Sequence, residues 1–124
     1  MNIQDFQRMI EATYFRKDSR RGVPSTFMWL VEEVGELGRD LRDVVCEPAP
    51  GRDPAAGRMA LESEFADVLA WLSTLASMAG VDLEAAAVGK YGGGCPRCRA
   101  VPCACDEARS ERPPGAGAPG AGAA

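Results

Sequence analysis

The sequence predicts an all-α protein built around an antiparallel helical hairpin with flanking helices. Four stretches carry helical signals, and the alternating runs of β-branched residues that predict strands are missing. The 124 residues allow one domain, and 46% of them are hydrophobic and 26% charged, as in soluble globular proteins. We expect a helical domain over residues 1–91, a cysteine-rich segment over 92–107, and a disordered tail rich in proline, glycine and alanine over 108–124.

The first two helices are predicted on either side of a turn. Asn2 can cap a first helix over residues 3–17. The glycine and proline of segment 18–24 predict a turn. Ser25 can then cap a second helix over residues 25–45.

Two further helices follow a loop. Residues 47–54 contain three prolines and a glycine, which predicts a loop. A third helix is expected over residues 55–79, ended by Gly80, and Asp82 can cap a fourth over 82–91. Because the loop is short, the second and third helices should form an antiparallel hairpin.

Composition excludes several classes of function. The net charge of −4 argues against a nucleic-acid-binding protein, and the absence of histidine removes histidine catalysis and histidine-bound zinc. No apolar run approaches the roughly 20 residues that cross a bilayer, and the N-terminus lacks the apolar core of a signal peptide. We therefore expect a cytoplasmic protein that does not contact a membrane.

Acidic residues repeat with the same phase in the predicted second and third helices. When Glu33 is aligned with Glu64, Glu36 falls on Asp67 and the apolar stripes coincide. Each helix then places its two carboxylates roughly 80° and 140° to one side of its stripe, so an antiparallel hairpin brings all four together. Such a group requires a counter-charge, and Mg²⁺ prefers oxygen ligands of this kind. The alternative is that these acids only face solvent, as many helical acids do.

The same acids lie in two segments that resemble the signature of MazG-like nucleotide pyrophosphohydrolases. The segments are WLVEEVGEL at residues 29–37 and LESEFADVLAWL at residues 61–72, and the signature reads E-E-x-x-E, a spacer, then E-x-x-D. The resemblance implies that the magnesium ligands and catalytic carboxylates are Glu33, Glu36, Glu64 and Asp67. Glu32, on another face of its helix, is a candidate for supporting a ligand or contacting a second subunit.

The resemblance also implies a reaction and an assembly. The expected reaction is Mg²⁺-dependent hydrolysis of a nucleoside triphosphate to a monophosphate and pyrophosphate, by attack of water on the α-phosphorus. Family members form dimers or tetramers that build a four-helix bundle around each site, so a homodimer or homotetramer is expected. Two alternatives remain: hydrolysis of a phosphoribosyl-ATP-like metabolite, and a non-catalytic dimeric interaction protein that carries a zinc knuckle.

Several residues are weaker candidates for binding the substrate. Trp29 and Trp71 flank the acidic edge and could stack on a base or ribose, although such residues more often pack in the core. Lys90 resembles a family position that carries a phosphate-binding base, but it is equally consistent with a solvated lysine at a helix end. A basic group that could attract the triphosphate, or simply be surface charge, comprises Arg16, Lys17, Arg20 and Arg21.

Four cysteines crowd into the segment after the last predicted helix. Cys95 and Cys98 form a C-x-x-C motif, and Cys103 and Cys105 form a C-x-C motif. Four thiolates so close together predict a small tetrahedral zinc knuckle, with unbound or redox-active thiols as the alternative. The isolated Cys46 is expected to serve only as a small apolar residue.

Overall fold

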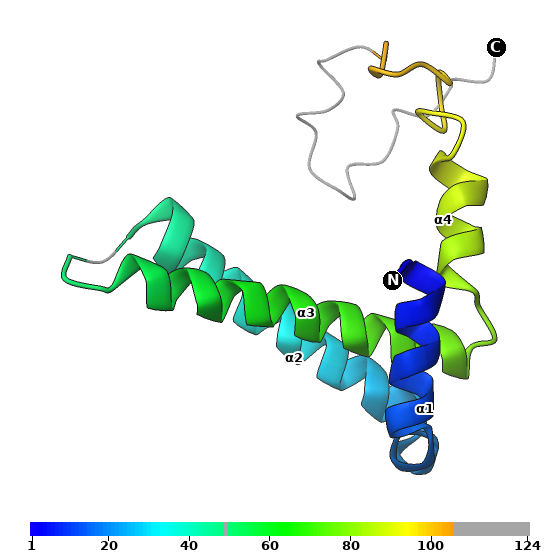
Figure 1. The fold of residues 1–124 in the computed structure, drawn as a ribbon, viewed down its shortest axis with the longest axis horizontal. Coiled ribbons are helices and arrows are strands. Elements are labelled where there is room, and N and C mark those ends of the chain that lie inside the picture. Colours follow the sequence, from blue (N-terminus) through cyan, green and yellow to red (C-terminus); the bar gives the residue numbers. More distant parts are fainter. Residues whose placement is uncertain (49, 106–124) are drawn as a thin grey trace, which may run out of the picture. The chain divides into compact units, whose positions relative to one another are not determined.

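A computed structural model describes residues 1–48 and 50–105 of the chain, and these residues contain helices and no strand (Figure 1). The elements are α1 (Ile3–Arg21), α2 (Val23–Leu41), a π-helical turn η1 (Arg42–Cys46), α3 (Pro54–Met78) and α4 (Leu83–Tyr91). The prediction of an all-α fold with a cysteine cluster near the C-terminus is confirmed. The predicted disordered tail, and the end of the predicted cysteine-rich segment from residue 106, lie outside the described residues.

The chain divides into two units, residues 1–86 and residues 87–124. The first unit contains α1, α2, η1, α3 and the start of α4, and it therefore holds all of the predicted carboxylate ligands. The second unit contains the rest of α4 and the four clustered cysteines.

The connection between α1 and α2 is a single glycine, so the predicted turn over residues 18–24 and the predicted Ser25 cap are wrong. Gly22 has φ 83°, a conformation that glycine adopts without strain, and its N–H bonds to the carbonyl of Asp18 at 3.1 Å. The proline that was expected to break the chain instead occupies the first turn of α2, where no intrahelical N–H bond is lost. Both helices are consequently longer at this corner than the sequence predicts.

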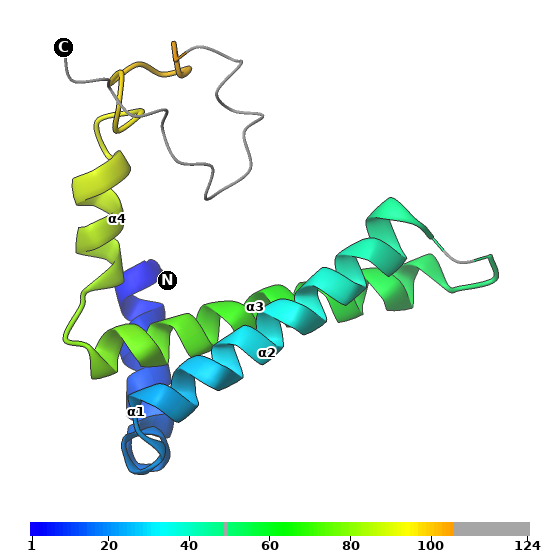
Figure 2. The ribbon, with the colours of Figure 1, turned by 180° about the vertical axis from the view of Figure 1, so that it is seen from behind.

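Helices α2 and α3 form the long antiparallel hairpin, and they lie side by side in both ribbon views (Figure 1, Figure 2). The π-helical turn η1 extends α2 toward the loop, and Asp53 caps α3 by accepting a bond of 3.0 Å from the N–H of Ala55. Helix α1 packs across the opposite end of the hairpin, against the C-terminal half of α3. There the amide of Gln7 donates to the hydroxyl of Ser77 and to the carbonyl of Val81.

The described residues bury little apolar surface. The buried apolar residues are Ile10, Leu61 and Ala76. By contrast, one side of the hairpin, here called the apolar flank, has six large apolar side chains that are 40–53% exposed. The apolar flank consists of Phe27, Val31, Val34, Phe65, Leu69 and Leu72. The helical unit thus leaves much of the hairpin's apolar surface uncovered.

None of the helices in the described residues is by itself long and apolar enough to cross a membrane. Only α3 and α4 taken together reach the necessary length and hydropathy, and a sharp bend separates them.

Candidate active site

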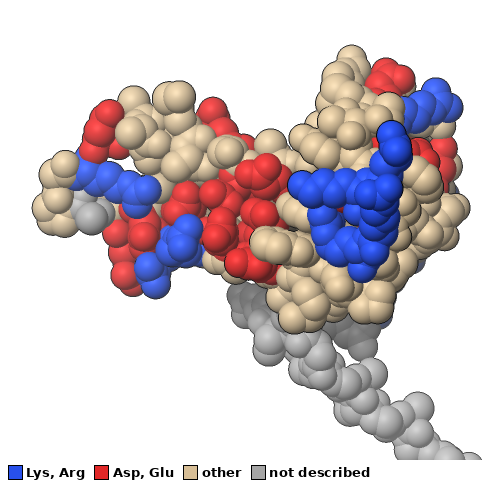
Figure 3. All heavy atoms as spheres, turned by 90° about the horizontal axis from the view of Figure 1, so that it is seen from below, with Lys and Arg blue, Asp and Glu red and all other residues tan. Residues whose placement is uncertain are grey.

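The two long helices meet along the part of their apolar stripes that lies nearest the acids. Leu61 is 4% exposed, whereas Val34 and Phe65, at the edge of the stripes away from the acids, are each about half exposed. Glu33 and Glu64 are less exposed than these apolar neighbours. The hairpin therefore has an acidic side and an apolar side, and acidic side chains gather over its middle in the space-filling view (Figure 3).

Three of the four predicted ligands lie together. Carboxylate oxygens of Glu33, Glu64 and Asp67 are all within 4.8 Å of one another. Glu36 is not part of this group, although its charge raises the pKa of both Glu33 and Glu64. Glu32 is exposed on α2, and its charge also raises the pKa of Glu33.

The electrostatics of the group call for a cation. Partial burial raises the pKa of Glu33 above its usual 4.5, and the charge of Asp67 adds to this effect. The pKa of Glu64 is also raised, first by burial and then by the charges of Glu36 and Asp40. Among the described residues, Oε2 of Glu64 is the buried side-chain atom that has no hydrogen-bond partner. Clustered hard oxygen ligands with an unpartnered lone pair fit a divalent cation such as Mg²⁺.

Asp40 is an acid near this group that the sequence motif did not identify. Asp40 is 7% exposed, and its charge raises the pKa of Glu64 across the hairpin. The nearest basic atom is Nε of Arg39, at a loose 3.7 Å. The spacing of Glu33, Glu36 and Asp40 along one helical face was the available signal.

The two tryptophans contact each other beside the carboxylates. The rings of Trp29 and Trp71 stack with centroids 5.8 Å apart and planes at 10°. Nε1 of Trp71 donates a hydrogen bond of 3.1 Å to Oε1 of Glu33, which opposes the rise in the pKa of that carboxyl. The guanidinium of Arg21 lies 4.7 Å from the centre of the Trp71 ring, a cation–π distance. Trp71 therefore links the acidic group to the basic corner between α1 and α2.

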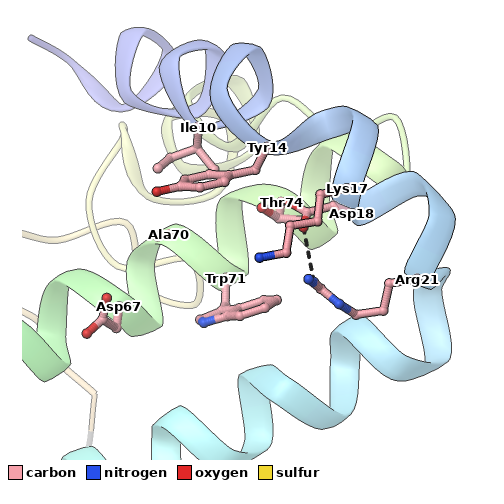
Figure 4. A pocket seen from close by; sticks show the side chains of 9 residues that line it. All are labelled: Ile10, Tyr14, Lys17, Asp18, Arg21, Asp67, Ala70, Trp71 and Thr74. Atoms are coloured by element: carbon pink, nitrogen blue, oxygen red, sulfur yellow. Dashed lines mark hydrogen bonds and ion pairs between the residues drawn. The ribbon is translucent and has the colours of Figure 1, made fainter.

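A pocket of about 220 Å³ lies between α1 and α3, next to Asp67 (Figure 4). Its lining includes apolar, aromatic and charged side chains, and it comprises Ile10, Tyr14, Lys17, Asp18, Arg21, Asp67, Ala70, Trp71 and Thr74. Asp18 is 5% exposed and accepts bonds of 3.1 Å from both Arg21 and Thr74. The sequence reading assigned Asp18 to a turn and so missed that it helps to build this wall.

Basic side chains gather beside the acidic group. Arg16, Lys17, Arg20 and Arg21 line a shallow depression at the end of α1, and Figure 3 shows a compact basic group next to the acids. The site thus combines acids suited to a cation with bases suited to phosphate oxygens.

The remaining predicted residues lie in the second unit or away from the site. Nζ of Lys90 lies 5.3 Å from the centre of the neighbouring Tyr91 ring. The Sγ atoms of the four clustered cysteines are all within 4.8 Å of one another. Cys46 is exposed at the end of η1.

Comparison with known proteins identifies one family. The family model of the MazG nucleotide pyrophosphohydrolase domain matches residues 21–98, which is more than half of the chain. No curated protein matches the sequence. The matched region covers α2, η1, α3 and α4 but leaves out almost all of α1, and it ends at the second cysteine of the cluster.

Proposed function

The chain belongs to the MazG nucleotide pyrophosphohydrolase domain family, and from this premise we propose that it hydrolyses nucleoside triphosphates to a monophosphate and pyrophosphate. The observation that carries the proposal is the group formed by Glu33, Glu64 and Asp67, with its unpartnered Glu64 oxygen, next to a pocket with basic side chains. The proposed cofactor of hydrolysis is Mg²⁺, with Zn²⁺ as a separate metal at the cysteine cluster, and the proposed location is the cytoplasm.

The proposed magnesium ligands are Glu33, Glu36, Glu64 and Asp67. When bound, Mg²⁺ neutralises charge on the phosphates and lowers the pKa of water. We propose that one carboxylate of this group accepts the proton of the attacking water.

The pocket and its basic edge are suited to different parts of the substrate. A volume of about 220 Å³ is below the roughly 300–1,000 Å³ typical of whole-ligand pockets, so it suits a base or a ribose and not an entire nucleotide. Tyr14 and Trp71 offer aromatic contact for that part. Lys17, which has no ion pair among the described residues, then remains available to neutralise the phosphates beside the acids, whereas Arg21 pairs with Asp18.

We also propose that the protein is a homo-oligomer that pairs two hairpins into a four-helix bundle. The apolar flank supports this proposal because its six side chains are 40–53% exposed in the single chain. Two such flanks packed together would bury these side chains.

The function is tested with a panel of canonical and modified nucleoside triphosphates and phosphoribosyl-ATP, with Mg²⁺ and with EDTA. We expect pyrophosphate and monophosphate to appear only with Mg²⁺. The rate should fall by about 10²-fold or more in Glu64→Gln, Glu36→Gln and Asp67→Asn, as when a group that stabilises transition-state charge is removed. Glu62→Gln is the matched control, since Glu62 lies on the same helix but pairs with Arg58 at 2.9 Å.

Binding of Mg²⁺ alone provides a second measurement. A cation that binds only the folded state stabilises it by about 2.7 kcal/mol at a concentration 100 times its Kd. Thermal unfolding should therefore shift upward with Mg²⁺ in the parent and in Glu62→Gln, but not in Glu64→Gln. Intact nucleotides throughout the panel, together with equal Mg²⁺ shifts in all variants, would contradict the proposal.

A further inference from the structure

The four cysteines of residues 95–105 have the mutual distances of a tetrahedral metal site. Sγ of Cys95 lies 3.8 Å from that of Cys105 and 3.4 Å from that of Cys103, which in turn lies 3.8 Å from Sγ of Cys98. A tetrahedron with Zn–S bonds of about 2.3 Å has edges of about 3.8 Å. A disulfide requires about 2.05 Å, so none of these pairs is bonded. We infer that these residues form a closed, structural zinc site, separate from the magnesium-dependent reaction.

The backbone of the loop is shaped to bring the first two sulfurs together. The N–H of Arg99 donates to the carbonyl of Cys95 at 2.7 Å, and the N–H of Cys95 donates to the carbonyl of Ala100 at 3.2 Å. Gly94 has φ 91°, and a Cβ at this position would lie 2.8 Å from the carbonyl oxygen of Arg99. Glycine is therefore required where the chain folds back on itself, which is a specific feature and not that of a loose tail.

Main-chain groups also stabilise the sulfurs as thiolates. The N–H of Ala104 lies 3.3 Å from Sγ of Cys98, and the N–H of Cys105 lies 3.4 Å from Sγ of Cys103. Main-chain N–H donors of this kind favour the deprotonated sulfurs that a metal requires.

The ligand set determines which metal fits and what it does. Four thiolates in tetrahedral arrangement select Zn²⁺ or iron, and four protein ligands leave no open position for a substrate. Arg97 and Arg99 supply two positive charges in the same loop, which balance the charge of −2 that Zn²⁺ and four thiolates carry together. The family model ends at Cys98, so the half of the site formed by Cys103 and Cys105 lies outside the family region.

The inference is tested by measuring metal content and the accessibility of the thiols, neither of which needs a nucleotide. The full chain, produced with zinc in the medium, should carry about one zinc ion per chain by mass spectrometry. Replacement by Co²⁺ should give the absorption bands of a tetrahedral thiolate site. Cys46→Ser is the matched control and should keep the zinc. In Cys98→Ser and in Cys103→Ser, the zinc content per chain should fall at least about tenfold.

Thiol labelling distinguishes a lost site from a lost fold. In the parent only Cys46 should react quickly, and a chelator should expose the other four thiols. Circular dichroism should show the same helix content in every variant, because the four clustered cysteines lie outside the helices and Cys46 is exposed at the end of η1. A parent chain that contains no zinc and gives no cobalt absorption bands would overturn the inference. So would a parent chain whose five thiols react equally fast. Bound iron, or zinc retained equally in Cys98→Ser, would also overturn it.

Discussion

At the scale of single residues, Glu64 best shows why the acidic group needs a cation. One of its oxygens is buried without a partner, and acids on α2 and α3 act on it together. In the metal-free protein this carboxyl should therefore work against folding. The same property that makes it a good ligand makes it unfavourable when no metal is present.

This cost should appear as a dependence of stability on pH in EDTA. Because the folded-state pKa of Glu64 is raised above 4.5, the folded protein holds the proton in a pH range where the unfolded chain has released it. Folding stability must then fall as the pH rises from the unfolded value through the folded one. Glu64→Gln cannot ionise, so its stability relative to the parent should increase over this pH range.

The measurement is urea unfolding of both proteins in EDTA at a series of pH values from about 4 to 8. Glu62→Gln should follow the parent, since Glu62 is paired with Arg58 on the surface of α3. If the free energy of unfolding of the parent and of Glu64→Gln changed with pH in parallel, ionisation of Glu64 would not destabilise the metal-free protein.

We expect the indole nitrogen of Trp71 to affect Mg²⁺-dependent hydrolysis more than its ring does. Trp71→Phe retains an aromatic ring beside Trp29 but removes the hydrogen bond to Glu33. Because that bond lowers the pKa of Glu33, its loss should raise this pKa further. A group that orients a metal ligand typically contributes about 10–100-fold to metal affinity or activity. The Mg²⁺ concentration that gives half-maximal hydrolysis should therefore rise by about 10–100-fold in Trp71→Phe.

The comparison variant is Trp29→Phe, since in the described residues the indole nitrogen of Trp29 donates no hydrogen bond. It should keep the Mg²⁺ dependence of the parent. The acid limb of the pH–rate profile should move to higher pH in Trp71→Phe alone. Equal effects of the two substitutions would mean that only ring packing is important.

At the scale of the elements, the attachment of α1 to α3 depends on a buried polar contact. Asp18 is 5% exposed and accepts a bond of 3.1 Å from the hydroxyl of Thr74. Thr74→Val preserves the shape but leaves the carboxylate without this donor, which should cost about 1–3 kcal/mol of unfolding free energy. The measurement is the midpoint of urea unfolding. Thr13→Val is the control, because its hydroxyl bonds only to the carbonyl of Met9 in its own helix.

A normal midpoint for Thr74→Val would mean that α1 is held by its other contacts, those of Gln7 with Ser77 and Val81. A drop for Thr13→Val as large as that for Thr74→Val would mean that the loss is not specific to the α1–α3 contact. Comparing Thr74→Val with Thr13→Val therefore shows whether the contact between Asp18 and Thr74 holds α1 against α3.

The sequence predicts the elements well but not how they rotate against one another. Helical periodicity and the proline-rich loop were sufficient to identify the α2–α3 hairpin. They could not show that α1 continues through Asp18, because that depends on a contact with Thr74 on a distant part of the chain. Likewise, no local pattern reveals that Trp71 on α3 bonds to Glu33 on α2. The resemblance to a family identified candidate ligands, but Asp40 and the pocket wall required the structure.

At the scale of the whole molecule, the apolar flank is the apolar surface that a single chain leaves exposed. Only three apolar residues are buried in the described part of the chain, which is a small core for a stable domain. Removing a Val, Leu or Phe side chain from water contributes roughly 1.5–3 kcal/mol, so pairing two flanks would add substantially to stability. Assembly and folding should therefore be coupled, and the apparent stability should increase with protein concentration.

Val31→Glu tests this expectation directly. Val31 lies in the apolar flank and is 48% exposed in the single chain, so a glutamate there is tolerated by the monomer but buried without a partner in the assembly. Light scattering after size exclusion should show a dimer or tetramer for the parent and a monomer for the variant. Met59→Glu is the matched control, since Met59 is 71% exposed and lies outside the apolar flank. If both variants assemble like the parent, the hairpins do not pair through this flank. If the parent itself is a monomer at every concentration, the four-helix bundle is ruled out as the assembly of this chain.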